Sequence, residues 1–378
     1  MGFMVTEPLE LLNWQRITVE ESMPPEVQPA CPSCGQLLTE FVRLAAADGH
    51  RAIRVGACYH CAYLGYLDRP TREWISRYYD RVWSHGAEKD TEALAAKKQK
   101  SNPARSAIER ALAMLPDPRA AIVEIGSGYG TMLKFIRANG FLNLIGIESS
   151  RRRAEAATRA TGFPILSGDF EAPAIQSELA RRAPIRLLLA FHVLEHTYHP
   201  GEVLAACARL QKSGDLLVLG VPNVWGEPAM NILLFLPHLH SFSASSLAQL
   251  INRSGYEVVD SSFSNQAEVI LIAKRTTMLV DSRTPARDYG SDLTIKFRRE
   301  LCLDQPLDAG RTYRYFWSKD TATVFGLKPY HWYWRIQDRL AGRSGCRSLL
   351  VEPLADDVSI ADLPFRVQFA RNLFLCIK

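Results

Sequence analysis

The chain has 378 residues, of which 47% are hydrophobic and 22% charged, and its net charge is +5 at pH 7. This length allows two or three domains with a well-buried core. This mild positive charge does not indicate the concentrated basic face that is typical of a nucleic-acid-binding protein. No apolar run reaches the roughly 18 residues that a membrane span needs. Because the first residues lack a basic stretch followed by an apolar one, we expect no secretory signal and a cytoplasmic protein.

Residues 1–70 predict a small, ribbon-like unit, which we call the cysteine module. Cys31 and Cys34 form one C-x-x-C pair, and Cys58 and Cys61 form a second. Each pair presents two thiolates from one tight turn, and two such turns supply the four sulfurs of a tetrahedral, structural zinc site. A redox dithiol at one pair, or a histidine in place of one sulfur, is the alternative. The other cysteines are scattered, as expected in a reducing cytoplasm.

Residues 71–118 show helical periodicity and are expected to link this module to a larger domain. Trp74, Tyr78 and Val82 recur four residues apart, which indicates one helix face. From 119 to 275, short apolar runs alternate with helical patterns, as is typical of parallel βαβ units. The last two runs are separated by only a short link, which predicts an antiparallel hairpin at the edge of an otherwise parallel sheet.

A glycine-rich turn follows the first of these apolar runs. Gly126, Gly128 and Gly130 stand between a predicted strand and a predicted helix, where doubly wound folds bind ligands. Thr131 occupies the third glycine position of the dinucleotide fingerprint, which disfavours a nicotinamide or flavin cofactor. Glu148, about twenty residues further on at the end of the second strand, can accept both hydroxyls of an adenosine ribose. A tight turn followed by an exposed glutamate is the structural alternative.

The order of motifs over about residues 70–275 resembles class I S-adenosylmethionine-dependent methyltransferases, closest to the ubiquinone-type and sugar-type enzymes. The motifs are VEIGSGYG, IGIESS, GDF, FHVLEH, LQKSGDLLVLGVPN and HLHSFSASSLAQLINRSGYEVVD. The resemblance implies an α/β fold with a seven-stranded Rossmann-like sheet, mostly parallel with an antiparallel last strand, and S-adenosylmethionine as cofactor. It implies these cofactor-binding residues: Glu124, Gly126, Gly128, Gly130, Glu148, Ser149, Asp169, Phe170, Phe191 and His192.

The implied reaction is an in-line displacement at the sulfonium methyl group, in which most of the catalysis comes from positioning and desolvation. A hydroxyl acceptor needs a base, and histidine suits this task near neutral pH. The candidates are His192, His196, His199, His238 and His240, of which we predict His196 and His240 as catalytic.

We expect O-methylation of a small molecule or a glycan precursor, and no nucleic-acid partner. One alternative is an RNA or protein acceptor, with the zinc ribbon as a docking module, and another is a non-catalytic binding protein with a degenerate fold. The cysteine module also resembles the zinc-binding segment ahead of sugar C-methyltransferases. The Tyr/Glu/His cluster expected of C-methylating members is not evident in FHVLEHTYHP, which disfavours C-methylation.

Residues 276–378 are predicted to form a C-terminal α+β extension that caps the acceptor site. Residues 330–334 are nearly all aromatic, which favours a buried element over a stacking platform for the substrate. Arginines at every fourth position from 335 to 347 indicate a basic helix stripe, either solvated or phosphate-binding. An oligomer is compatible with this composition.

Overall fold

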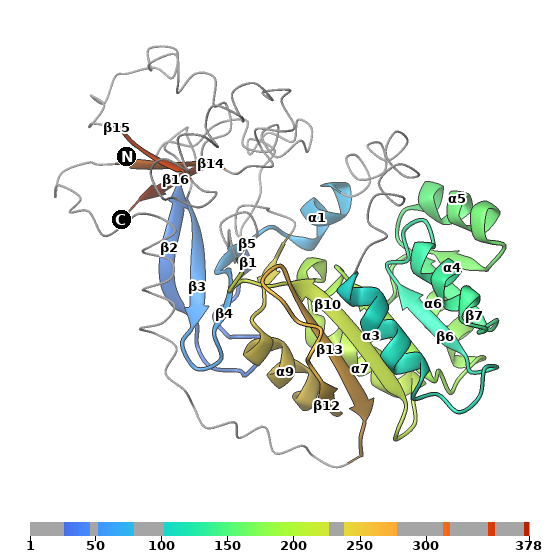
Figure 1. The fold of residues 1–378 in the computed structure, drawn as a ribbon. Helices are drawn as coiled ribbons and strands as arrows, with labels where there is room; N and C mark the ends of the chain where they lie inside the picture. Colours follow the sequence, from blue (N-terminus) through green and yellow to red (C-terminus); the bar gives the residue numbers. More distant parts are fainter. Residues whose placement is uncertain are drawn as a thin grey trace, which may run out of the picture.

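The computed structural model describes residues 26–45, 52–78, 102–226, 238–277, 313–317, 347–351 and 374–377. They form two seven-stranded sheets and a two-stranded ribbon. The two large sheets lie side by side, one belonging to the cysteine module and the other to the predicted Rossmann-like domain (Figure 1). In the part of the chain that is described, no helix is long and apolar enough to cross a membrane.

The Rossmann-like sheet has the strand order β12-β13-β10-β9-β6-β7-β8. Neighbouring strands from β10 to β8 run parallel, whereas β13 is antiparallel to both β10 and β12. The predicted fold, a mostly parallel sheet closed by an antiparallel strand, is therefore confirmed. The strands are β6 (Ile122–Ile125), β7 (Leu144–Glu148), β8 (Ile165–Ser167), β9 (Leu187–Phe191), β10 (Leu216–Pro222), β12 (Tyr256–Asp260) and β13 (Glu268–Arg275).

Helices cover both faces of this sheet, because its central strands are apolar on both sides. In β9, Leu187 and Leu189 pack with the helices of one face, and Leu188 and Ala190 pack with those of the other. Each fully buried leucine contributes about 1.5–3 kcal/mol. One face carries α3 (Pro103–Leu112), α4 (Thr131–Ala138) and α5 (Arg151–Thr161), and the other carries α6 (Pro173–Ala180), α7 (Pro200–Leu210) and α9 (Ala244–Arg253).

Local signals in the sequence set the ends of several helices. The Asn102 side chain accepts a hydrogen bond from the Ala104 amide, and Pro103 occupies the first turn of α3. Ser150 caps α5 in the same way, and Gly162, with φ of 73°, ends it. The helix α1 (Arg72–Tyr78) lies in the first part of the predicted linker.

The second large sheet is antiparallel and joins three distant parts of the chain, in the order β11-β4-β3-β2-β16-β14-β15. The cysteine module supplies β2 (Thr39–Ala45), β3 (Ala52–Cys58) and β4 (Tyr63–Tyr66), while its β1 (Glu26–Val27) and β5 (Asp68–Arg69) form the separate ribbon. The Rossmann-like domain contributes β11 (His240–Ser241). The C-terminal extension contributes β14 (Tyr313–Trp317), β15 (Arg347–Val351) and β16 (Phe374–Ile377).

The described parts of the predicted C-terminal extension therefore belong to the sheet of the cysteine module. The aromatic run at 330–334 and most of the arginine repeat lie outside the described residues. Strand pairing between segments hundreds of residues apart has no local sequence signal, which is why the sequence did not predict this shared sheet.

Candidate active site

The glycine turn leaves the end of β6 with three residues in the left-handed region, at φ of 70° for Gly126, 54° for Gly128 and 72° for Gly130. A Cβ atom at Gly126 would lie 2.5 Å from Val193 Cγ2, and one at Gly130 would lie 2.5 Å from Thr161 Cγ2. At Gly128 a Cβ atom would meet nothing within 4 Å. The first and third glycines are thus required by packing, whereas the second faces open space in which a ligand can touch the backbone.

Glu148 joins the end of β7 to this turn. Its Oε2 accepts a hydrogen bond from the Gly128 amide at 3.0 Å, and its Oε1 accepts one from the Ser150 amide at 3.0 Å. The side chain is buried, and Ser149 beside it is exposed. The predicted pairing of the glycine loop with an acidic residue is present in the structure, at the carboxyl edge of the sheet.

Glu124, inside β6, is a second buried carboxyl group near the first. Burial, followed by the charge of Glu148, raises its pKa to about 8. Its Oε2 has no hydrogen-bond partner among the described residues. A buried carboxyl oxygen of this kind is costly unless a polar or cationic group meets it.

Asp169 and Phe170, the predicted adenine contacts, follow β8. The Gly168 amide donates to the Glu148 carbonyl at 3.0 Å, which holds this turn against the end of β7. Asp169 is exposed there, whereas the Phe170 ring packs in the core. The turn therefore lies beside Glu148, with the carboxylate of Asp169 on the outside.

His192 directly follows β9 and has a positive φ of 54°, a strained conformation for a residue other than glycine. Its amide donates to the Gly220 carbonyl at 2.8 Å, and the ring of the preceding Phe191 lies against Gly220. Nε2 of His192 is 2.8 Å from Glu268 Oε1, and Nδ1 is 3.3 Å from Glu195 Oε1. Loss of hydration opposes a charge here, but the two carboxylates outweigh it and raise the pKa of His192 to about 10. His192 is therefore an imidazolium at neutral pH.

Glu195 lies in a short 3-10 helix, Leu194–His196, directly after this strand end. It is 1% exposed, and its Oε1 is 3.9 Å from His196 Nε2. Burial favours its neutral form, but His192 and the two other imidazoles outweigh burial and lower its pKa to about 2. The rings of His196 and His238 are 4.8 Å apart. One buried carboxylate is thus surrounded by three imidazoles.

His240, the other predicted base, is 1% exposed and engaged at both ring nitrogens. The Tyr63 hydroxyl is 2.7 Å from Nδ1, and Nε2 is 3.0 Å from the Thr197 carbonyl. Burial and the charge of Arg69 lower the pKa of His240 to about 3. The ring is therefore neutral at physiological pH.

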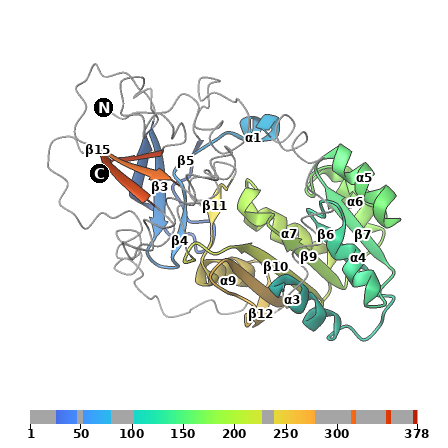
Figure 2. The ribbon, with the colours of Figure 1, turned by 45° about the horizontal axis from the view of Figure 1, so that its top comes forward.

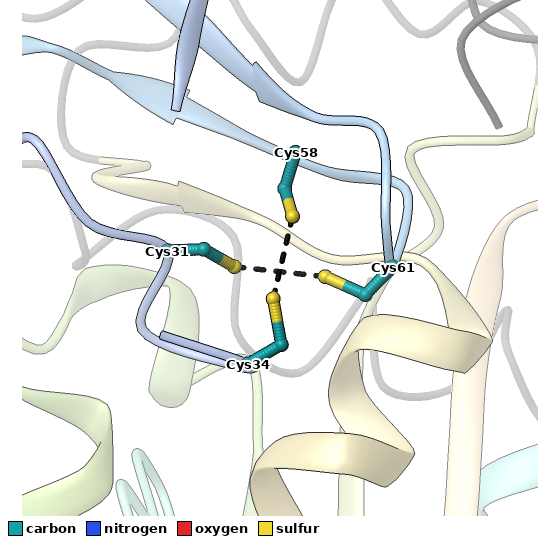
Figure 3. A group of neighbouring side chains, drawn as sticks. All are labelled: Cys31, Cys34, Cys58 and Cys61. Carbon is teal, nitrogen blue, oxygen red and sulfur yellow. Dashed lines mark hydrogen bonds between the residues drawn. The ribbon is translucent and has the colours of Figure 1, made fainter. Parts of the chain in front are cut away.

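The four cysteines of the two C-x-x-C pairs converge in the structure (Figure 3). The Sγ atoms of Cys31 and Cys61 are 3.5 Å apart, and those of Cys34 and Cys58 are 3.3 Å apart. All four sulfurs lie within 4.8 Å of one another. Each pair lies on a turn closed by a backbone hydrogen bond, from Gly35 to Cys31 and from Ala62 to Cys58.

Comparison with known proteins identifies the class of the central domain. A family described as a methyltransferase domain matches residues 96–261. The ubiquinone biosynthesis O-methyltransferase of Caulobacter vibrioides is 31% identical over 133 residues, which are 32% of this chain and 52% of that protein. The chain therefore spans about half the length of this curated relative.

Solved structures of methyltransferases are also similar. The magnesium protoporphyrin IX methyltransferase of Synechocystis matches with a TM-score of 0.40 and 14% identity, over 55% of this chain and 100% of that one. A SAM-dependent methyltransferase of Archaeoglobus fulgidus matches with a TM-score of 0.38 and 15% identity, over 49% of this chain and 100% of that one.

The family match, the strand order and the glycine loop agree with one another. The chain contains a class I S-adenosylmethionine-dependent methyltransferase domain, which we call the methyltransferase domain, and the predicted class is confirmed. The site fits this cofactor on two structural counts. Gly128 leaves room for a ligand against the backbone, and Glu124 offers an unpaired carboxyl oxygen to a cationic molecule.

Three residues of the site were not predicted from the sequence: Glu195, Glu268 and Tyr63. Glu195 had a usable signal, since an acidic residue three positions after His192 can face that ring across one helical turn. Glu268 and Tyr63 had none, because their contacts with His192 and His240 cross 76 and 177 residues of chain.

Proposed function

We propose that the protein transfers a methyl group from S-adenosylmethionine to a hydroxyl group of a small molecule or glycan precursor. The observation that carries the proposal is the arrangement at the carboxyl edge of the sheet. The cradle formed by Gly128 and Glu148 lies at the end of β6 and β7, and the Glu195 group lies at the end of β9, the strand next to β6. The similarity to an O-methyltransferase supports oxygen as the acceptor atom.

The cofactor supplies an electrophilic methyl group when it is bound. We propose that the glycine loop, Glu124 and Glu148 hold it, together with Ser149, Asp169, Phe191 and His192. Phe170 supports the same turn from the core. Backbone amides and a ribose-binding carboxylate orient such a ligand, and the buried surroundings of Glu124 limit competition from water.

For the proton of the acceptor hydroxyl, we propose His196 as the base in preference to His240. His240 is buried, with both ring nitrogens occupied, whereas the His196 side chain is 18% exposed and lies beside the Glu195 carboxylate. That carboxylate stabilises the imidazolium that forms when His196 accepts a proton. Glu195, His196 and His238 also have the spacing of a metal site, but in-line transfer of a sulfonium methyl group depends on positioning and needs no metal, so we assign this group to proton transfer.

We further propose a structural zinc ion at the four cysteines. Their sulfurs approach one another closely enough to share one ion, and soft thiolates in a tetrahedral set are the ligands that zinc prefers. Four protein ligands leave no open position, which gives the ion a structural role. Reduced cysteines of this kind support a cytoplasmic location.

The domain boundaries at about residues 70, 118 and 275 are also proposals. The pairing of β16 with β2 supports a C-terminal extension that works with the cysteine module. In that case the extension acts on the acceptor site through the module.

The first test is calorimetric titration of the full chain with S-adenosylmethionine. Wild-type protein is expected to bind one equivalent, and Glu148→Ala to bind about tenfold more weakly or worse, the scale of losing hydrogen bonds to a charged group. Glu155→Ala is the matched control, because Glu155 is 52% exposed on the nearby α5. A panel of hydroxylated sugars and phenols is then screened for release of S-adenosylhomocysteine. Absence of cofactor binding by the wild type would overturn the proposed function.

A further inference from the structure

The cysteine module and the methyltransferase domain meet beside the predicted base. β4 pairs with β11 through Gly65 and His240 and through Leu64 and Ser241. Figure 2 shows β11 between β4 and the rest of the methyltransferase domain. Two side chains of the module act on the backbone that directly follows His196: Arg69 contacts it directly, and Tyr63 reaches it through His240.

The first contact is a chain of two hydrogen bonds, which runs from the buried Tyr63 through the buried His240 to the carbonyl of Thr197. The Thr197 carbonyl can only accept, so His240 Nε2 must carry a proton and donate it across the 3.0 Å contact. A neutral ring then has an unprotonated Nδ1, which must accept from the Tyr63 hydroxyl across 2.7 Å. Tyr63 is 0% exposed and His240 is 1% exposed, so water does not replace either bond. The geometry thus fixes one tautomer of His240.

The second contact involves the next residue along the chain. Arg69, 4% exposed, donates to the Tyr198 carbonyl at 2.7 Å, and its guanidinium carbon lies 3.7 Å from the centre of the Tyr198 ring. Arg69 also donates to Gln28 within the module at 2.7 Å. The Tyr198 carbonyl is therefore held directly by Arg69 of the cysteine module, and the preceding Thr197 carbonyl is held by His240, which Tyr63 of the module orients.

We propose that Tyr63, His240 and Arg69 are positioning residues, through which the cysteine module sets the placement of Glu195 and His196. The inference rests on the proposed function, in which His196 receives the acceptor's proton. His196 immediately precedes the two carbonyls, and its 3-10 helix has only three residues, so a shift at Thr197 displaces the ring. The module is then part of the acceptor side of the active site, and His240 acts through hydrogen bonds alone.

The proposal predicts different effects for two substitutions of His240. In His240→Gln, the amide can donate to Thr197 and accept from Tyr63, so methyl transfer is retained if His240 is a positioning residue and lost if it is the base. His240→Leu removes both bonds. Tyr63→Phe removes only the hydroxyl and keeps the ring volume. Arg253→Gln is the control, because Arg253 also reaches the module, donating to the Ser33 carbonyl at 3.3 Å, but from α9 rather than from the segment after His196.

The experiment compares these variants by nitrogen-15 NMR of labelled histidine rings in the full chain, and by S-adenosylmethionine titration. We expect the wild type to show His240 protonated at Nε2. Tyr63→Phe and His240→Leu should move the His196 ring resonances, whereas His240→Gln and Arg253→Gln should leave them near wild type. Cofactor affinity should change by less than about twofold, because none of these residues touches the glycine loop. With an acceptor from the panel, Tyr63→Phe and His240→Leu should slow turnover by about tenfold or more, the cost of a small misplacement.

The inference is overturned if Tyr63→Phe leaves the His196 resonances in place, or if Arg253→Gln moves them equally. Failure of the proposed function has a different signature, because wild-type protein would then not bind S-adenosylmethionine while the histidine spectra still report the coupling. His240→Leu, should it fail to fold, is replaced in the comparison by Tyr63→Phe.

Discussion

Two buried glutamates of the site, Glu124 and Glu195, are both shielded from water, but their pKa values shift in opposite directions. Glu195 has three imidazoles around it, and these lower its pKa to about 2 in spite of burial. At Glu124, burial and the charge of Glu148 act in the same direction and raise the pKa to about 8. The difference is set by the charge of the neighbours rather than by depth, since both side chains are 5% exposed or less.

Replacing Glu124 by glutamine should therefore stabilise the cofactor-free protein at alkaline pH. A carboxyl whose folded pKa lies above its unfolded value of 4.5 contributes stability that is complete below pH 4.5 and is lost as the pH rises through about 8. Glutamine does not ionise, so its contribution to stability stays constant over this window. The free energy of unfolding of Glu124→Gln should therefore match that of the wild type near pH 5 and exceed it at pH 9 by on the order of 3–5 kcal/mol.

Urea unfolding at pH 5, 7 and 9 measures this difference directly. Glu155→Gln, on the exposed surface of α5, is the control and should show no such trend. If the gain from Glu124→Gln is the same at all three pH values, the carboxyl of Glu124 is not neutral in the folded protein.

At the scale of elements, sequence and structure agree wherever a pattern is local. The apolar runs between residues 119 and 275, the glycine turn and the two C-x-x-C turns depend on residues within about ten positions of each other, and the structure contains each of them. The sheet shared by β11, the cysteine module and the C-terminal strands depends on pairing over long distances, which composition does not encode. For the same reason, the sequence did not indicate that Tyr63 and Glu268 belong to the site.

The glycine turn allows a test in which two substitutions have different effects. Gly126→Ala should destabilise the fold by about 1–3 kcal/mol, because the new methyl group meets Val193 and the backbone is left-handed. Gly128→Ala has the same backbone cost but no steric contact. We expect it to unfold more like the wild type and to bind S-adenosylmethionine much more weakly, since its methyl group occupies the open space.

Thermal unfolding and calorimetric titration of both variants check this expectation. Gly214→Ala, also at positive φ with nothing near its Cβ position, controls for the backbone cost away from the site. Wild-type affinity in Gly128→Ala would show that the cofactor does not lie against this part of the loop.

At the scale of the whole molecule, the cysteine module and the methyltransferase domain share one hydrophobic core. Cys31, Cys61 and Tyr63 belong to the same buried cluster as Phe242 and Leu247 at the start of α9. The Ser243 hydroxyl, which caps α9, also donates to the Cys61 carbonyl at 3.0 Å. A substitution at the four cysteines should therefore also change the stability of the methyltransferase domain.

We expect the purified protein to contain one zinc ion per chain and to unfold in a single thermal transition. Cys31→Ser should abolish the metal and lower that one transition, since zinc bound at a thousand times its dissociation constant contributes about 4 kcal/mol. Cys207→Ser is the matched control, because Cys207 is equally buried, on α7, but is not part of the four-cysteine group. Metal analysis by plasma mass spectrometry and scanning calorimetry provide the two readouts. Two separate transitions in Cys31→Ser, with the larger one unchanged, would mean that the shared core does not couple the module to the methyltransferase domain.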